Sequence, residues 1–182
     1  MKRRTLLVAG AVLPLVAVAA DASTTTHDHT HFSIDLPQGY IGPSEHVAGA
    51  SVSHGFRKPY PGTALNSVIL VTVQEMGPSF ARRVPTERAR LTRETLDPIV
   101  AGLEGNRVGF HRSEPANVAI AGYAGLKIAW IGVAQGIAFD GVVYCVLAGS
   151  RAIAIQIQDP IGRDKARLAE AMRAVERMRI RK

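Results

Sequence analysis

Three apolar stretches separated by glycine-containing segments fill residues 122–159. They cover residues 126–133, 142–148 and 152–158 and are rich in β-branched side chains. Each stretch has the length of a strand, and the glycines between them can adopt the positive φ that tight turns require. The pattern predicts a meander of three consecutive antiparallel strands at the centre of the fold.

The alternation of side chains along these strands predicts how the sheet is covered. Around Tyr144 and Cys145, the residues on both faces are apolar. An antiparallel sheet with one wet face would alternate apolar with polar residues, so we expect packing on both faces. The last strand differs, because one of its faces carries Gln156 and Gln158. This polar face predicts that the covering thins towards one edge or lines a cleft, and we expect a binding site there.

The rest of the pattern predicts more strands before the meander and two helices. Strands are expected over residues 32–36, 47–56, 67–75, 107–112 and 118–120, and helices over residues 86–104 and 162–177. Pro98 either kinks the first helix or begins a second short helix with Asp97 as its cap. The predicted fold class is α+β, an antiparallel sheet of about six to seven strands with helices on both faces in an α/β/α sandwich.

The N-terminus has the features of an export signal. Lys2, Arg3 and Arg4 precede an uncharged stretch, residues 5–20, that ends in small residues. A membrane span needs about 20 apolar residues, and this stretch is shorter. We therefore expect cleavage near Ala20 and a periplasmic or secreted mature protein without a membrane span. General secretory and twin-arginine export both stay open.

Charge and cysteine content narrow the function classes. The net charge is +7, and it falls to +4 once the three cations of the predicted signal are removed. The other basic residues are interleaved with acidic ones along the predicted helices, which is typical of a solvated face, so nucleic acid is not an expected partner. The only cysteine, Cys145, lies in mid-strand and can form no internal disulfide. We interpret it as a packed core residue rather than a nucleophile.

Histidines are concentrated just after the predicted signal. Residues 21–30 are polar and without apolar periodicity, so they are predicted to form a flexible tail before a single domain over residues 31–182. His27, His29 and His31 are spaced two apart and would share one side of an extended chain. Three imidazoles so placed can hold Zn(II), Cu(II) or Ni(II). The alternative is a soluble tail whose histidines bind nothing.

A second group of candidate residues follows the predicted strand at residues 47–56. Arg57, Lys58 and Tyr60 lie in a proline-stiffened segment that places two cations between aromatic rings. Such a segment can form the rim of a site for an anionic or aromatic ligand, and the alternative is an ordinary surface loop. Together with Gln156 and Gln158, these residues form the predicted ligand-binding set.

The first predicted strand carries a recognisable motif. Residues 32–40 have the form F-x-I-x-L-P-x-G-aromatic, with Tyr40 where tryptophan is frequent. The motif opens a domain that ends in a meander and one helix, and in this respect residues 31–182 resemble the PsbP-like family, whose fold is shared with a Ran-binding nuclear protein. The resemblance implies an antiparallel sheet between helices and, as in many bacterial members, an exported protein. No functional residue of the photosynthetic member is matched here.

The predicted function is an exported, non-catalytic binding or accessory module with a small-molecule or protein partner. Metal binding through the histidine tail is the alternative. An enzyme ranks third among these functions, because the sequence contains neither H-E-x-x-H nor G-x-S-x-G. No catalytic residue is therefore predicted.

Overall fold

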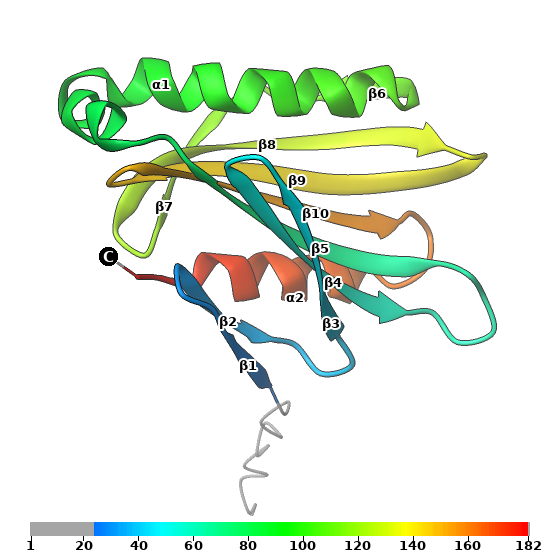
Figure 1. The fold of residues 1–182 in the computed structure, drawn as a ribbon. Helices are drawn as coiled ribbons and strands as arrows, with labels where there is room; N and C mark the ends of the chain where they lie inside the picture. The colour runs from blue at the N-terminus through cyan, green and yellow to red at the C-terminus, as the bar shows by residue number, and fades with distance from the viewer. Residues whose placement is uncertain (1–23, 182) are drawn as a thin grey trace, which may run out of the picture.

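Two antiparallel sheets and two helices make up the described part of the protein (Figure 1). The structure is a computed structural model and describes residues 24–181 of the 182-residue chain. The predicted export signal lies outside the described residues. The fold class is α+β, as predicted, and most of the described chain is antiparallel sheet.

The larger sheet has eight strands and contains the predicted meander. They are β3 (Ile41–Ala48), β4 (Ser51–Pro59), β5 (Asn66–Glu75), β6 (Val108–Arg112), β7 (Ala116–Ile120), β8 (Tyr123–Ala134), β9 (Ile137–Ala148) and β10 (Arg151–Pro160). The order across the sheet is β3-β4-β5-β10-β9-β8-β6, and β7 also pairs with β8. The strands β8, β9 and β10 are paired in succession, so the predicted three-strand meander is confirmed.

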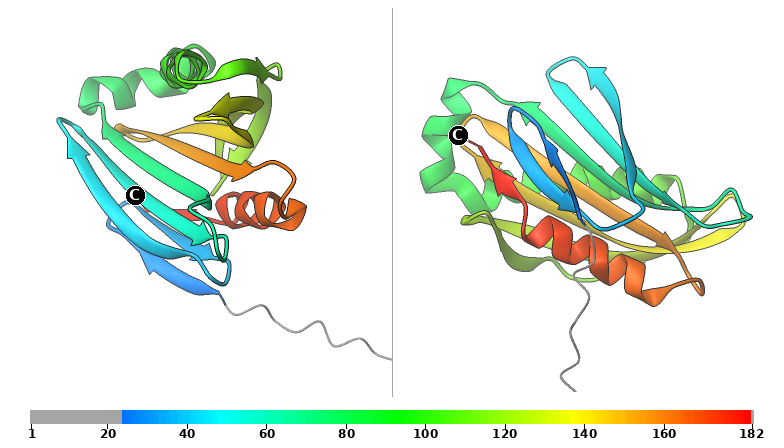
Figure 2. Two further views of the ribbon diagram at one scale, coloured as in Figure 1. Left: turned by 90° about the vertical axis from the view of Figure 1, so that its right-hand side faces the viewer. Right: turned by 90° about the horizontal axis from the view of Figure 1, so that it is seen from below.

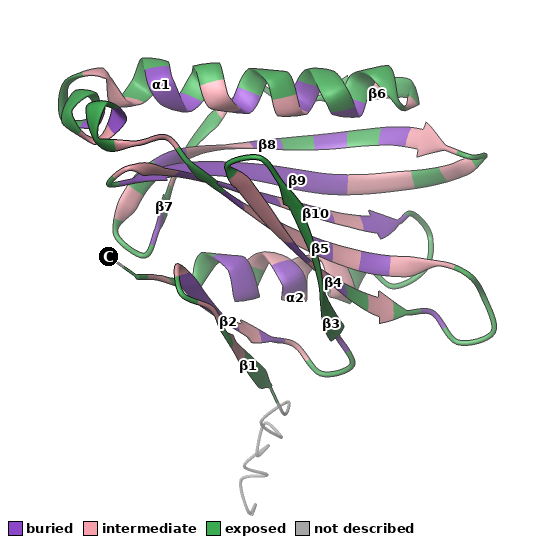
Figure 3. Ribbon diagram, viewed as in Figure 1, coloured by how far each residue is buried: buried purple, intermediate pink, exposed green. Residues whose placement is uncertain are grey.

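Strand β9 separates two hydrophobic clusters. Val142, Tyr144 and Val146 belong to one cluster, whereas Val143 and Cys145 belong to the other. Successive side chains of a strand point to opposite faces, so each cluster lies on its own side of the sheet. Figure 3 shows β9 buried over most of its length and β3 exposed throughout.

Helix α1 (Pro78–Gly105) covers one face of the sheet, over β8, β9 and part of β10. Figure 1 shows it above the sheet, and Figure 2 shows that its first turns run in a different direction from the rest. The helix begins before Pro85, earlier than the predicted start at residue 86, and it continues through Pro98, so the alternative of a second short helix beginning there is wrong. An internal proline costs about 3 kcal/mol. Burial of apolar side chains on this face, such as Leu96 and Val100, offsets that cost.

Helix α2 (Lys165–Glu176) and the smaller sheet pack on the other face of the large sheet (Figures 1 and 2). The smaller sheet has the order β1-β2-β11, from β1 (Thr25–Asp28), β2 (Phe32–Leu36) and β11 (Arg179–Ile180). Asp164 caps α2 by accepting a hydrogen bond from the Ala166 N–H at 3.0 Å.

Two expectations about the N-terminal part are corrected by the smaller sheet. Residues 25–28, predicted to be a flexible tail, form β1 and pair with β2 in register, His27 opposite Ile34. The covering of this face is therefore a helix together with a second sheet, which the predicted sandwich did not contain. Residues 25–28 are ordered because they pair with β2, and β2 is anchored by Phe32 and Ile34, which are both fully buried against the large sheet.

Candidate functional site

Strands β4, β5 and β10 present a polar face that α1 leaves largely uncovered. We call it the open sheet face. Its residues form four rows across the three strands: Ser51, Gln74 and Ala152; Ser53, Thr72 and Ala154; Gly55, Leu70 and Gln156; Arg57, Val68 and Gln158. Most are half-buried or exposed. The residues that alternate with them on β5 point to the opposite face and are buried in the cluster beneath α2 and the smaller sheet. The thinning of the covering that Gln156 predicted is therefore present on this face.

A groove of about 430 Å³ lies where the open sheet face meets α1. We call it the α1 groove. Its floor is made by residues of β5 and β10: Thr72, Gln74, Ala152 and Ala154. Its wall is made by α1 and by Met76 in the segment that leads to the helix; the helical residues are Phe80, Arg83, Leu91, Glu94, Thr95, Pro98 and Ile99. The wall is mainly apolar and the floor carries a hydroxyl and an amide.

The charged residues that line the α1 groove are paired along the helix. Arg83 donates to Glu87 at 3.1 Å, and Glu94 accepts from Arg90. Pro98 has no N–H, so the carbonyl oxygen of Glu94 receives no helical hydrogen bond from residue 98. The groove therefore offers apolar contact and neutral hydrogen-bonding groups.

A second hollow, of about 460 Å³, lies at the other end of the open sheet face. It is lined by Ile41, Gly42, Pro43, Ser44, Gly55, Phe56, Arg57 and Val68. Arg57, predicted from the sequence as a ligand contact, is exposed there. Gly42 is required in this place because a Cβ would lie 2.7 Å from the carbonyl oxygen of Gly55.

The structure divides the predicted ligand-binding set between the two faces of the large sheet. Arg57, Gln156 and Gln158 lie on the open sheet face, with Arg57 and Gln158 in the same row. Lys58 and Tyr60 lie towards α2, because alternate residues of an extended strand point to opposite sides. The five residues therefore do not surround one cavity.

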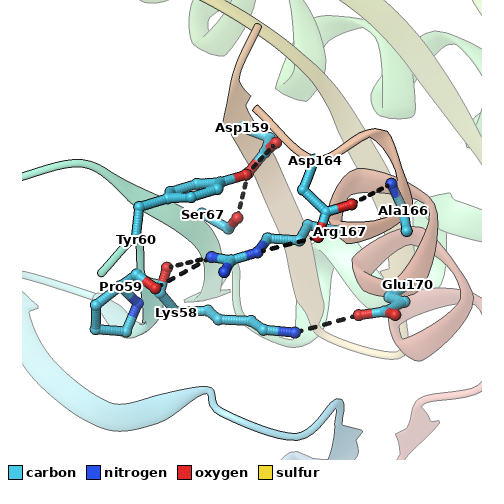
Figure 4. Close-up of polar contacts among 9 residues, drawn as sticks. All are labelled: Lys58, Pro59, Tyr60, Ser67, Asp159, Asp164, Ala166, Arg167 and Glu170. Carbon is cyan, nitrogen blue, oxygen red and sulfur yellow. Dashed lines mark hydrogen bonds and ion pairs between the residues drawn. The ribbon is translucent and has the colours of Figure 1, made fainter. Parts of the chain in front are cut away.

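The side chain of Tyr60 belongs to a buried polar network beneath α2 (Figure 4). Its hydroxyl lies 2.9 and 3.1 Å from the carboxylate oxygens of Asp159, which also accepts from the Ser67 hydroxyl. Burial raises the pKa of Tyr60, and the hydrogen bond to the Asp159 carboxylate raises it further. The guanidinium of Arg167 lies 3.8 Å from the centre of the Tyr60 ring. The network joins the β4–β5 connection to β10 and α2.

Lys58 and Gln158 also contact other parts of the protein. The Lys58 ammonium donates to Glu170 of α2 at 3.3 Å (Figure 4). Gln158 accepts from Arg107 at 2.9 Å, and the guanidinium of Arg107 lies 4.4 Å from the centre of the Trp130 ring. In this structure Lys58 contacts the middle of α2, and Gln158 contacts a residue just after the C-terminal end of α1.

The predicted metal ligands lie near a histidine that the sequence analysis missed. His27, His29 and His31 gather beside His54 of β4, whose side chain is 1% exposed. Burial lowers the pKa of His27, His31 and His54. In residues 24–181, no three histidine, cysteine or acidic side chains already surround a common point that could hold an ion. Metal binding by these histidines stays a prediction.

Cys145 is fully buried against α1, as its position in the strand pattern predicted. Burial raises the pKa of its thiol to about 12. A thiol in such surroundings is protonated at neutral pH and is out of reach of a substrate. The interpretation of Cys145 as a core residue is confirmed.

Comparison with known proteins shows the fold. No family model and no curated protein matches the chain. Among solved structures, cyanobacterial PsbP from Synechocystis is similar with a TM-score of 0.61 at 10% identity, over 93% of this chain and 99% of that one. The chain therefore has a PsbP-like fold, as its first strand motif predicted.

Two further solved structures are similar at comparable identity. LpqN of Mycobacterium tuberculosis, which is described as involved in cell envelope biogenesis, has a TM-score of 0.52 at 13% identity, over 91% of this chain and 88% of that one. A Bacteroides thetaiotaomicron protein has a TM-score of 0.50 at 14% identity; 84% of this chain matches, and it spans 46% of that protein. At these identities the likeness shows the fold alone. None of the helices in the described part is long and apolar enough to cross a membrane.

Proposed function

We propose that this protein is an exported, non-catalytic binding module whose ligand occupies the α1 groove. The observation that carries the proposal is the lining of the groove, which joins an apolar helical wall to a floor with Thr72 and Gln74. Its volume of about 430 Å³ lies within the range of about 300–1,000 Å³ that is usual for small-molecule sites.

The chemistry of the lining defines the class of ligand. Leu91 and Ile99 offer contact to an apolar body, while the Thr72 hydroxyl and the Gln74 amide can bond a polar end. Thr72 is already oriented, because its hydroxyl lies 2.9 Å from that of Ser53 in the same row. We infer a small amphipathic organic molecule with an uncharged or singly charged polar end.

Export is the second part of the proposal. The basic and then apolar N-terminus supports it, and so does the similarity to LpqN, a protein described as involved in cell envelope biogenesis. The groove lining supports a non-catalytic role, because the charges among its residues, Arg83 and Glu94, are paired along α1. A general acid or base would need an ionisable group directed at the ligand.

The proposal is tested by titration with anilinonaphthalenesulfonate, a fluorescent apolar probe with one anionic end. We expect saturable binding to the folded protein and loss of that binding in Ala154→Phe, because the new ring fills the floor of the groove. Ala119→Phe adds the same ring at an exposed position of β7 and should bind as the unaltered protein does. Unchanged binding by folded Ala154→Phe would place the ligand elsewhere.

A further inference from the structure

Four imidazoles from two parts of the chain, residues 27–31 and strand β4, meet between the smaller sheet and β4. We call His27, His29, His31 and His54 the histidine cluster. The ring centroids of His29 and His54 are 4.2 Å apart, those of His29 and His31 5.4 Å, and those of His27 and His54 6.0 Å. The cluster combines three residues of the N-terminal segment with one residue of a central-sheet strand.

His54 has an environment that calls for a ligand. Its side chain is 1% exposed, and neither of its ring nitrogens has a hydrogen-bond partner among the described residues. The Nε2 atom of His27 is buried and without such a partner in the same part of the structure. Buried polar atoms are nearly always hydrogen-bonded, because an unbonded one loses its hydration without compensation. Several such nitrogens side by side point to a group that would bind them together.

The spacing of the rings suits one shared ion. An imidazole nitrogen lies about 2.0–2.1 Å from Zn(II), so two imidazoles in a tetrahedral site have ring centroids about 5 Å apart. The observed separations of 4.2 Å and 6.0 Å from His54 to its two neighbours lie on either side of that distance. His54 is thus close enough to each of these two neighbours, and binding one ion with all three requires the rings to reorient, since they do not already surround a common point.

The surrounding hydrogen bonds decide which histidines are ligands. Arg151 lies 2.8 Å from the Nδ1 atom of His31 and, as a guanidinium, can only donate to it, which occupies that lone pair. The Nδ1 atom of His29 accepts a longer bond of 3.3 Å from the backbone N–H of His31, and coordination of an ion by that Nδ1 atom would break only this bond. His27 Nε2 and the nitrogens of His54 have no bond to break.

We propose that His27, His29 and His54 form a site for one late first-row divalent ion, Zn(II) or Cu(II), with His54 as its rigid member. The site differs from a histidine tail in two respects. It includes a buried residue of β4, and it leaves His31 outside the coordination sphere. Nitrogen donors of this kind suit Zn(II) and Cu(II), whereas Mg(II) and Ca(II) are bound by oxygen ligands. The Glu45 carboxylate lies 3.8 Å from the Nδ1 atom of His54, beyond hydrogen-bond distance.

Calorimetric titration of the purified protein with Zn(II) or Cu(II) salts at neutral pH tests the site. We expect one ion per chain, with affinity lowered at least about tenfold in His54→Gln and in His29→Gln, since loss of even an outer-shell partner has an effect of that size. His31→Gln is the matched control within the cluster and should bind normally. The double variant His46→Gln, His111→Gln removes the two histidines outside the cluster and should also bind normally.

The outcomes separate the site from its rivals. Absence of binding by the unaltered protein, or equal binding by folded His54→Gln, overturns the proposal. Loss of binding in His31→Gln with retention in His54→Gln would assign the ion to the three tail histidines instead and also overturns it.

A measurement on the unaltered protein covers the case in which His54→Gln fails to fold. Bound Cu(II) should broaden the nuclear magnetic resonance signals of Phe32 and Phe56, whose rings are 5.9 Å and 5.0 Å from that of His27. Signals of Leu96, a buried residue of α1 on the other face of the large sheet, should stay sharp. Sharp phenylalanine signals at saturating Cu(II) contradict the site.

Discussion

The hydroxyl of Tyr60 lies 2.9 and 3.1 Å from the two carboxylate oxygens of Asp159, although the residues are 99 positions apart in the chain. Asp159 is 3% exposed, so its carboxylate depends on donors supplied by the protein. Tyr60 and Ser67 are those donors, and Arg167 stacks on the Tyr60 ring from α2. Through Tyr60, the bond to Asp159 and the stacking of Arg167 together connect α2 to the large sheet.

Removing that hydroxyl should destabilise the protein measurably. In Tyr60→Phe the buried carboxylate keeps Ser67 but loses its second donor, and we expect the free energy of unfolding to fall by about 1–3 kcal/mol. Urea unfolding followed by circular dichroism measures the difference. Tyr123→Phe, at a half-buried position of β8, is the control and should change stability by less than about 0.5 kcal/mol. Equal effects of the two variants would show that the Asp159 contact contributes little.

The buried thiol of Cys145 should be unreactive and should make stability pH-dependent. Burial raises its pKa from about 8.5 in an unfolded chain to about 12. At pH values near 8 only about one thiol in ten thousand is then ionised, so a disulfide reagent should label the protein slowly until urea unfolds it.

The sign of the pH dependence follows from the same pKa. The folded state holds the Cys145 proton more tightly, so the free energy of unfolding falls as pH rises above the unfolded value of about 8.5, by at most about 1.4 kcal/mol per pH unit. Cys145→Ala should lose about 1 kcal/mol at neutral pH and show a shallower decline in alkali. A steeper decline in the variant would contradict the buried assignment.

Gly141 of β9 should not tolerate a side chain. A Cβ there would lie 2.3 Å from the carbonyl oxygen of Ile157 and 2.6 Å from the Trp130 ring. We expect Gly141→Ala to destabilise the protein by more than about 2 kcal/mol, measured by thermal unfolding. Gly102→Ala in α1 has nothing within 4 Å of its Cβ and should raise stability by up to about 1 kcal/mol. Stability changes of the same sign in Gly141→Ala and Gly102→Ala would contradict this prediction.

Export predicts a processed N-terminus. Protein isolated from the native host should begin between Ala20 and Ser23 by mass spectrometry, because residues 17–22 offer small side chains at the positions that a signal peptidase recognises. An Arg3→Ala, Arg4→Ala variant would separate twin-arginine from general secretory export. Recovery of mature protein that still starts at Met1 would contradict the proposal of export.

The central meander could be predicted because its pattern is local. Around Tyr144 and Cys145, apolar residues on both faces require two coverings, and the structure has them in two clusters. The course of α1 through Pro98 could not be predicted, since it depends on burial against strands far away in the sequence. Strand β1 was missed for a similar reason, because its residues are polar and their pairing with β2 provides the order.

The candidate site was predictable in part. Gln156 correctly indicated the open sheet face, because a polar residue on this face of β10 is expected where no helix covers the sheet. Lys58 and Tyr60 were grouped with Arg57 because the segment looked like a loop, and the continuation of β4 to Pro59 turns them to the other side. His54 shares a face with the buried Phe56, and that alternation in β4 is the signal by which it could have been found.

The unequal support of the two helices has a consequence for motion. Helix α2 contacts both sheets, whereas α1 packs mainly on β8, β9 and β10 and lines the α1 groove along one edge of this contact. Amide protons of α1 should therefore exchange with solvent through a partial opening that leaves α2 and the smaller sheet intact. A molecule in the groove would close that opening, and slower exchange confined to α1 would reveal its presence even before its identity is known.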